Sequence, residues 1–334
     1  MRTLLTLAAF GLLACGSPDA STDTSTETAD TPTLPTTPTM QTIKFNADGN
    51  TLVGNLHLPA GFDESETYPA VVVDGSWTTV KEQMQGLYAN ALAEEGYIAL
   101  AFDHRYYGES EGSPREFENH NAKVADIKAA VTYLQSLPYV ANDRIGGLGV
   151  CASGAYMMQA TAEDDRIRAY AGVVPWLMTP ETAKLFYGGD EGTQDRIAKA
   201  NAAEQKRESS GDIEYVPAYD PDNKEAAMFF PVEYYAKESR GNVPAWNNNF
   251  AVESWKYWLT YDGVESSKNV DVPAVIVGSD KQFLPEGAKA ALDNFQGPTE
   301  MVWLSEYEHD QFYDSPEVIA QAVAGVETFF DAHL

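Results

Sequence analysis

A cysteine that follows an apolar segment is the residue best suited to nucleophilic chemistry in this 334-residue chain. Residues 145–150 have the character of a β-strand, Cys151 follows them directly, and a helix-prone run begins at Ala155. The stretch Gly149-Val-Cys-Ala-Ser153 is a variant of G-x-S-x-G, a strand–turn–helix motif that presents a nucleophile at the tip of a strained turn. Small flanking residues avoid clashes there, and the helix start favours a thiolate and an oxyanion. The motif predicts that Cys151 is a nucleophile; the alternative is a small buried apolar side chain.

The elements that must position this cysteine alternate between strand and helix patterns. The predicted strands span residues 41–45, 51–58, 68–74, 96–102, 145–150, 168–174, 270–277 and 300–304, and the predicted helices span 80–95, 122–137, 155–160 and 316–330. The first two strands flank the turn 46–50 and predict an antiparallel hairpin. The later alternation of strand and helix predicts βαβ crossovers and a mostly parallel sheet.

Residues 175–262 interrupt this alternation. The segment is rich in Trp, Tyr and Phe and is broken by Gly-Gly, Pro-Ala and Asn runs. A structureless loop of this length is improbable inside a compact domain. We therefore expect helical elements inserted as a cap over about 176–262. Its aromatic rings would either line an acyl or aryl pocket or pack the cap onto the sheet.

Three motifs in chain order resemble the α/β-hydrolase superfamily. They are Asp74-Gly-Ser-Trp-Thr-Thr-Val-Lys-Glu-Gln-Met84, the stretch 103–112 and Gly149-Val-Cys-Ala-Ser-Gly154. More narrowly, they resemble the dienelactone-hydrolase-like branch that carries Cys in place of Ser. The resemblance covers residues 41–334 and implies an α/β-hydrolase fold, with a mostly parallel twisted sheet, helices on both faces and an inserted helical cap. The chain departs from the family pattern in Asp74-Gly-Ser76, where many members have His-Gly, and in Ser153, which replaces a glycine.

The same resemblance implies the partners of the nucleophile. The superfamily commonly keeps the acid of its triad after the strand that ends here near Gly278, so Asp280 is the expected acid and Glu286 the reserve. Asp280 could instead be a turn or helix-cap residue. The superfamily keeps its general base on the loop before the final helix, where His309 lies. The order nucleophile, acid, histidine agrees with this assignment.

An oxyanion hole needs two hydrogen-bond donors near the nucleophile. We expect one to be the backbone N–H of Ala152. The other should come from the loop after Asp74, where Ser76 and Trp77 are the candidates. Trp77 could instead only form a wall of the pocket.

The expected activity is hydrolysis of ester, thioester or lactone bonds through a Cys-His-Asp triad and a covalent acyl-enzyme. The expected partner is a small-molecule substrate of the ester type. Two alternatives from other classes remain: an acyltransferase on the same fold, and a non-catalytic surface-binding lipoprotein. Peptidase activity is also open, although no propeller-like repeat is visible.

Composition narrows the partners further. The formal net charge of −28 argues against binding to nucleic acid or to anionic lipid surfaces. The chain has no His-x-x-x-His or Cys-x-x-Cys spacing and no Gly-rich phosphate loop after its first parallel strand. We therefore expect neither a metal site nor a cofactor.

The first 40 residues have the composition of an export signal and a tether. Residues 1–15 combine Arg2 with a short apolar run and end in Leu12-Leu13-Ala14-Cys15, which resembles a bacterial lipobox with Cys15 as the lipidation site. Residues 16–40 are rich in Ser, Thr and Pro and predict a disordered tether, which leaves 41–334 as the hydrolase domain. The resemblance implies an exported lipoprotein, periplasmic or at the cell surface, that meets the membrane only through its lipid anchor. The residue after the cysteine is not Asp, which favours the outer membrane; an ordinary secretory signal is the alternative.

Overall fold

The computed structural model describes residues 35–334. The predicted signal segment, the lipidation site Cys15 and most of the predicted tether lie outside the described residues. The first strand begins at Thr39, inside the range predicted as tether. No helix within residues 35–334 is long and apolar enough to cross a membrane.

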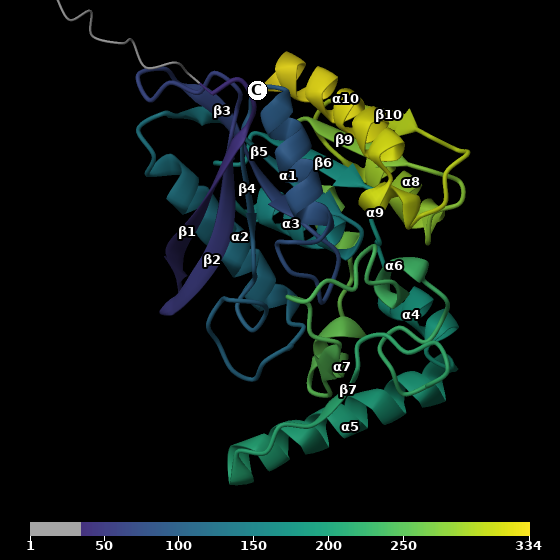
Figure 1. Cartoon of the computed structure of the whole chain (residues 1–334). Helices are drawn as coiled ribbons and strands as arrows, with labels where there is room; N and C mark the ends of the chain where they lie inside the picture. Colours follow the sequence, from purple (N-terminus) through teal and green to yellow (C-terminus); the bar gives the residue numbers. More distant parts are fainter. Residues whose placement is uncertain (1–34) are drawn as a thin grey trace, which may run out of the picture. The chain divides into compact units, whose positions relative to one another are not determined.

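An eight-stranded sheet forms the centre of the described region (Figure 1). Its strands, in sheet order, are β1 (Thr39–Ala47), β2 (Asn50–Leu58), β4 (Ile98–Phe102), β3 (Tyr68–Asp74), β5 (Val140–Val150), β6 (Ala169–Val173), β9 (Ala274–Gly278) and β10 (Thr299–Trp303). The β1–β2 hairpin and the β2–β4 pair are antiparallel, and every later pair is parallel. The predicted mostly parallel sheet is confirmed. Because helices cover both faces of its parallel part, strands such as β3 are apolar on both faces.

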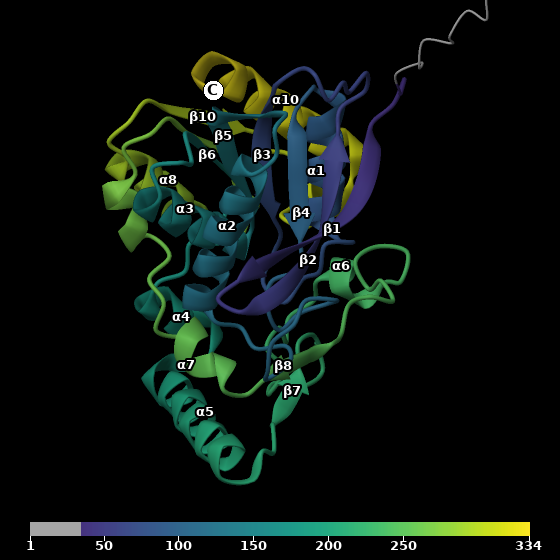
Figure 2. The same cartoon turned by 90° about the vertical axis from the view of Figure 1, so that its left-hand side faces the viewer.

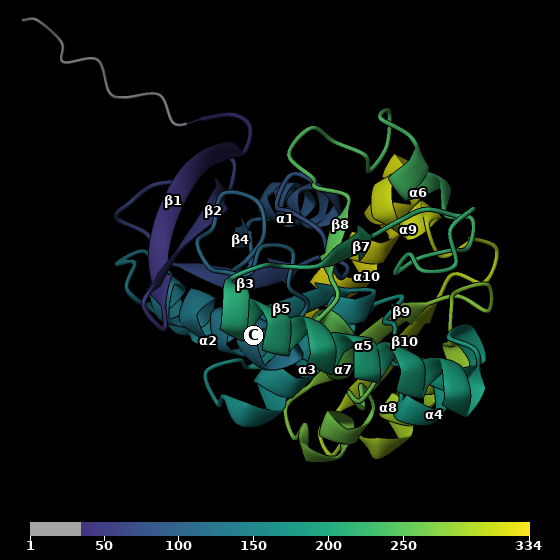
Figure 3. The ribbon, with the colours of Figure 1, turned by 90° about the horizontal axis from the view of Figure 1, so that it is seen from below.

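Helices pack against both faces of this sheet, as Figure 3 shows from below. One face carries α1 (Met84–Glu94) and α10 (Pro316–His333), which contact each other. The other face carries α2 (His120–Gln135), α3 (Ala152–Glu163) and α8 (Pro285–Asn294). Helix α9 (Gln311–Asp314) precedes α10 and contacts it.

Helix α1 begins four residues later than the sequence predicts. Thr78 has a left-handed backbone with φ of 59°. The backbone N–H of Val80 donates to the side-chain oxygen of Gln83, and the N–H of Lys81 donates to a carboxylate oxygen of Asp103. These groups hold residues 78–83 in a turn, so the helix can start only at Met84.

The segment between β6 and β9 leaves the sheet and forms the cap, beyond one end of the strands (Figures 1 and 2). It contains α4 (Pro180–Phe186), α5 (Gly189–Ser210), β7 (Tyr215–Pro217), α6 (Glu233–Ala236), β8 (Asn249–Ala251), α7 (Ser254–Trp258) and a 3-10 helix (Glu265–Asn269). The cap is therefore not purely helical as expected, because β7 and β8 pair antiparallel. Much of the chain between α5 and α7 is irregular, in keeping with its Pro, Gly and Asn residues.

Candidate active site

Cys151 occupies a strained turn between β5 and α3. Its backbone has φ of 57° and ψ of −122°, a region that non-glycine residues rarely adopt. A Cβ atom at Gly149 would lie 2.2 Å from the carbonyl oxygen of Ser153, so this turn requires glycine two residues before the cysteine. The Cys151 N–H donates to the Val173 carbonyl, and its own carbonyl accepts from the Trp176 N–H at 2.8 Å. The turn is thus fixed by both neighbouring segments.

Polar groups surround the Cys151 sulfur, although its side chain is 4% exposed. The backbone N–H of Ala152 and the hydroxyls of Ser76 and Tyr313 lie close to the sulfur, and each acts to lower its pKa. Burial is the larger effect and leaves the pKa of the thiol above its ordinary value. At neutral pH Cys151 is therefore a thiol in this arrangement, and the neighbouring donors are ready to stabilise negative charge on the sulfur.

The His309 ring lies next to the same cluster but contacts it through Tyr313. Its Nε2 is 2.8 Å from the Tyr313 hydroxyl oxygen, and its Nδ1 accepts from the backbone N–H of Phe283 at 3.2 Å. An Nδ1 that accepts a hydrogen bond carries no proton, so we assign the neutral ring proton to Nε2. Burial lowers the pKa of His309 to about 3, which keeps the ring neutral.

The structure does not bring Asp280 to His309. The Asp280 side chain is 61% exposed, and its nearest cation is Lys289, with Nζ 3.8 Å from a carboxylate oxygen. The reserve residue, Glu286, is 84% exposed and also pairs with Lys289. The Phe283 N–H occupies the position on His309 Nδ1 that a triad carboxylate would take.

The loop after β3 places both predicted oxyanion residues at the cavity. Ser76 and Trp77 are buried and line it together with Ala152 and Cys151. Within residues 35–334 the Trp77 backbone N–H has no hydrogen-bond acceptor, so it is free to serve as a second donor. The Trp77 indole also stacks on Trp258 with ring centroids 3.9 Å apart, so this residue forms a wall of the cavity as well.

A buried carboxylate that the sequence analysis missed holds this loop. Glu118 accepts from the Thr78 backbone N–H at 3.1 Å and from the hydroxyls of Tyr107 and Tyr156, each at 2.8 Å. It also pairs with Lys123 at 2.9 Å. These partners outweigh burial and lower the pKa of Glu118, so it stays ionised. A buried, ionised glutamate is hard to recognise from sequence, because the sequence does not distinguish it from the many glutamates that are exposed.

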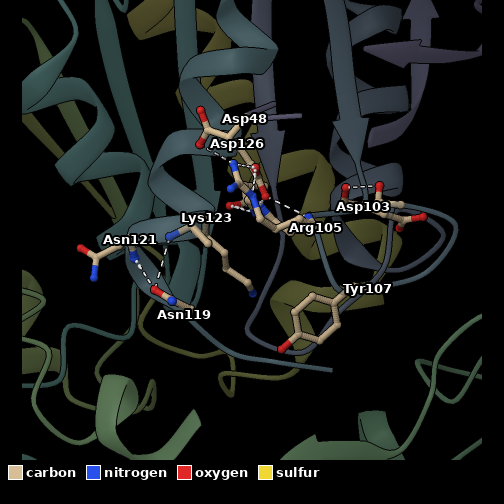
Figure 4. Close-up of polar contacts among 12 residues, drawn as sticks. Asp48, Asp103, Arg105, Tyr107, Asn119, Asn121, Lys123 and Asp126 are labelled. Carbon is tan, nitrogen blue, oxygen red and sulfur yellow. Dashed lines mark hydrogen bonds and ion pairs between the residues drawn. The ribbon is translucent and has the colours of Figure 1, made fainter. Parts of the chain in front are cut away.

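A second charged network lies at the start of α2, and Figure 4 shows part of it. Arg105 donates to Asp126 at 2.7 Å and to Asp48 at 3.0 Å. His104 bridges Asp126 and Asp74 through its two ring nitrogens, at 3.3 and 2.9 Å. The two carboxylates raise the pKa of His104 despite its burial. We infer a structural role for His104, which ties β4 to the end of β3, where the loop of Ser76 and Trp77 begins.

The cavity above the sulfur is small and almost entirely apolar. Its walls are uncharged and are made by Ser76, Trp77, Cys151, Ala152, Trp176, Tyr187, Met228, Phe230, Val232, Tyr235, Trp258, Phe283 and Tyr313. About 20 Å³ of it is open to the centre of a water molecule, which is room for roughly one water. No group of three or more His, Cys, Asp or Glu in the described part of the chain could hold a metal ion.

Comparison with known proteins agrees with this fold. Residues 48–311 match the family described as X-Pro dipeptidyl-peptidase (S15 family). The chain belongs to this family. It is therefore an α/β hydrolase, an enzyme of a superfamily that cleaves ester- and peptide-type bonds.

Individual relatives extend the comparison. The uncharacterised protein PA2218 of Pseudomonas aeruginosa is 31% identical over 311 residues, which cover 86% of this chain and 79% of the relative. Its crystal structure superposes with a TM-score of 0.77 at 27% identity, over 90% of this chain and 96% of that one. The thiohydrolase aneE of Aspergillus aculeatus is 34% identical over 131 residues, 39% of this chain and 40% of the relative. The α/β hydrolase GrgF of Penicillium shows the same fold, with a TM-score of 0.73 at 22% identity over 88% of this chain and 99% of that one.

Proposed function

We propose that this protein hydrolyses carboxylic ester or thioester bonds through a covalent acyl-enzyme on Cys151, in the manner of dienelactone-hydrolase-like enzymes. One observation carries the proposal: the thiol occupies a strained turn at a helix start, with the Ala152 N–H and two hydroxyls close to its sulfur in an aromatic cavity. Thioesters are included because the relative aneE is named a thiohydrolase.

The uncharged cavity favours esters over the substrates of a dipeptidyl-peptidase. Such a peptidase must hold the free ammonium group of a peptide N-terminus, and a buried ammonium needs a carboxylate partner. None of the residues that line the cavity carries a charge. The lining instead suits a neutral acyl group.

Tyr313 would carry the proton from the sulfur to the base. Its hydroxyl faces Cys151 Sγ and lies 2.8 Å from His309 Nε2. When the sulfur attacks the carbonyl carbon, the thiol proton passes to the Tyr313 oxygen, whose own proton passes to Nε2. The carbonyl electron pair moves to its oxygen, which the N–H groups of Ala152 and Trp77 stabilise.

The later steps regenerate the thiol. The tetrahedral intermediate expels the alcohol or thiol, which takes the proton from the imidazolium and leaves an acyl thioester on Cys151. Water then adds to the thioester carbonyl while His309 takes a water proton. The departing sulfur takes this proton from the His309 imidazolium through the Tyr313 hydroxyl, and the carboxylic acid is released.

This route requires a tautomer of His309 other than the one assigned from its contacts in this structure. Nε2 can accept a proton only when the ring proton is on Nδ1, and Nδ1–H needs an acceptor rather than the Phe283 N–H. Asp280 is the acceptor we propose, and it reaches the ring after the segment 279–284 shifts. Leu284 in this segment has φ of 53°, an unfavourable conformation for a leucine.

Substrate entry requires a movement of the same kind. Room for about one water cannot hold an acyl group, so we describe the structure as a closed form. Phe283 lines the cavity and also contacts the His309 ring, with centroids 4.9 Å apart. A single displacement of this segment would therefore widen the cavity and free Nδ1.

The test is hydrolysis of a short-chain 4-nitrophenyl ester and of a matched thioester by the wild type and by Cys151→Ala. The expected result is a loss of at least about 10³-fold in kcat in the variant, with an acyl adduct on Cys151 seen by mass spectrometry of the rapidly quenched wild type. Equal rates in the two proteins would overturn the proposal. Product analysis with an added alcohol distinguishes hydrolysis from acyl transfer.

A further inference from the structure

Three tryptophans line the cavity, and one of them has an indole N–H without an acceptor among residues 35–334. Trp77 donates through Nε1 to the sulfur of Met228 at 3.3 Å, and Trp258 donates to the Tyr187 hydroxyl at 3.0 Å. Trp176 is 7% exposed, and its Nε1 is buried with no acceptor among the residues that the structure describes. An indole N–H can only donate, so Trp176 lacks a partner that its two neighbours have.

Trp176 is also next to the nucleophile. Its backbone N–H donates to the Cys151 carbonyl at 2.8 Å, which fixes its position relative to the sulfur. Its ring packs among three phenylalanines, with centroids 5.0 Å from Phe186, 6.5 Å from Phe230 and 5.3 Å from Phe283. Each of these groups is apolar, and no residue within 35–334 replaces the hydration that the indole N–H loses on burial.

We propose that the Trp176 indole N–H recognises an acceptor oxygen on the acyl group of the substrate, and that the natural substrate carries a neutral, flat, oxygen-bearing acyl group. This inference rests on the proposed function, because it places the acyl group of the Cys151 thioester in this cavity. The oxygen belongs to an ether, hydroxyl or ketone group that is separate from the reacting carbonyl.

The cavity walls define the rest of this acyl group. Eight of the residues that line the cavity are aromatic: Trp77, Trp176, Tyr187, Phe230, Tyr235, Trp258, Phe283 and Tyr313. Such walls favour planar unsaturated or aromatic groups, which stack on or pack edge-on against the rings. An ionised acyl group would be desolvated without a charged partner, so a carboxylate or ammonium substituent is excluded.

Tyr235 supplies a further polar group in the same cavity. Its hydroxyl is buried without a partner among the described residues and lies close to Cys151 and Ser76. It comes from the cap helix α6, whereas Trp176 follows β6. The cavity therefore offers hydrogen-bonding groups both at the sulfur and at the Trp176 ring, which suits an acyl group with polar atoms at both places.

The experiment compares isosteric acyl groups on one leaving group. The probes are 4-nitrophenyl esters of benzoic acids with a methoxy or an ethyl substituent at the 3 or 4 position of the ring. Methoxy and ethyl have nearly the same shape, but only methoxy offers an acceptor oxygen. The wild type is expected to prefer methoxy over ethyl by about 10-fold or more in kcat/KM at one ring position.

The variant Trp176→Phe keeps an aromatic ring and removes the N–H. It is expected to lose the methoxy preference, so that the ratio of kcat/KM for the methoxy ester to kcat/KM for the ethyl ester falls to about one. Trp258→Phe loses the same ring volume, but its N–H is already bonded to Tyr187, so it is the matched control and keeps the preference.

Two results would overturn the inference: a wild type with no methoxy preference at either position, or a Trp176→Phe variant that retains it. The comparison of the methoxy and ethyl esters with the wild type tests the inference even if Trp176→Phe does not fold. Failure of the proposed function has a different signature, because Cys151→Ala would then hydrolyse both esters as fast as the wild type.

Discussion

The phenolic oxygen of Tyr313 lies 2.8 Å from His309 Nε2, and it also lies close to the Cys151 sulfur. The predicted nucleophile and the predicted base are thus connected by a residue that neither motif contains. Tyr313 lies in α9, and His309 lies two residues before the first residue of this helix, so the short segment 309–313 brings the two side chains into contact.

Tyr313→Phe should therefore slow catalysis without weakening substrate binding. We expect kcat for a short-chain ester to fall about 10²-fold with KM changed by less than a few-fold, the range for loss of one proton-transfer group. Tyr235→Phe removes a neighbouring hydroxyl that makes no hydrogen bond to His309 within the described residues, and it should leave kcat closer to wild type. Steady-state kinetics on both variants measures this difference. If the two substitutions lower kcat equally, Tyr313 has only a packing role.

Asp280→Asn distinguishes the observed closed form from the proposed active one. If Asp280 accepts from Nδ1 in the active form, the variant should lose about 10³- to 10⁴-fold in kcat, because an amide favours the wrong histidine tautomer. Glu286→Gln, at a similarly exposed position that pairs with the same lysine, should be nearly unchanged. A wild-type rate for Asp280→Asn would show that the Asp280 side chain stays exposed during catalysis, as it is in this structure.

The pH dependence of thiol alkylation reports the charge state of the site. Burial raises the pKa of Cys151 and lowers that of His309 to about 3, so the resting pair is thiol and neutral imidazole. The alkylation rate of the free enzyme by iodoacetamide should rise with pH through a midpoint above the usual thiol value of about 8.5. A rate that is already maximal at pH 6 would instead indicate a thiolate–imidazolium pair.

His57 should make the fold sensitive to acid. It is buried on β2, and burial lowers its pKa from 6.5 to about 4. Below pH 6.5 the unfolded chain binds a proton that the folded chain resists, so the free energy of unfolding falls as pH decreases from 6.5 to 4, by about 3 kcal/mol from this residue.

Urea unfolding of the wild type and of His57→Gln at pH 7 and pH 4 measures this contribution. The variant should lose less stability over the interval, although the buried His309 will still contribute in the same direction. A variant as acid-sensitive as the wild type would contradict the assignment.

Glu118→Gln should destabilise the fold and the site together. The amide keeps oxygen and size but leaves Lys123 buried without its counter-charge, which typically costs about 3–5 kcal/mol. Glu253 is also buried and ion-paired, but its partner Arg207 is partly exposed, so Glu253→Gln should cost less. Thermal unfolding of both variants ranks the two sites; equal shifts would show that Lys123 is solvated in the variant.

Local sequence was enough for the fold class and for the turn that carries Cys151. The alternation of strand and helix patterns predicted the parallel sheet, since these patterns arise from burial within each element. The small residue at Gly149 predicted the strained backbone of Cys151, because that requirement acts over a few positions of the chain. The start of α1 predicted from the sequence was wrong, because a hydrogen bond from the Lys81 backbone N–H to the distant Asp103 carboxylate keeps the helix from beginning earlier.

Only the tertiary structure decided how the site is connected. Tyr313 and Trp176 are far from Cys151 in the chain and meet it through packing, which leaves no short-range pattern to read. The contact of the Phe283 N–H with His309 Nδ1 depends on the conformation of one loop, which the residue types alone do not specify. The sequence determined which residues can do chemistry, because it specifies the type of each side chain and the local backbone preferences around it. The structure decided which of them touch, because contacts between distant segments depend on the packing of the whole fold.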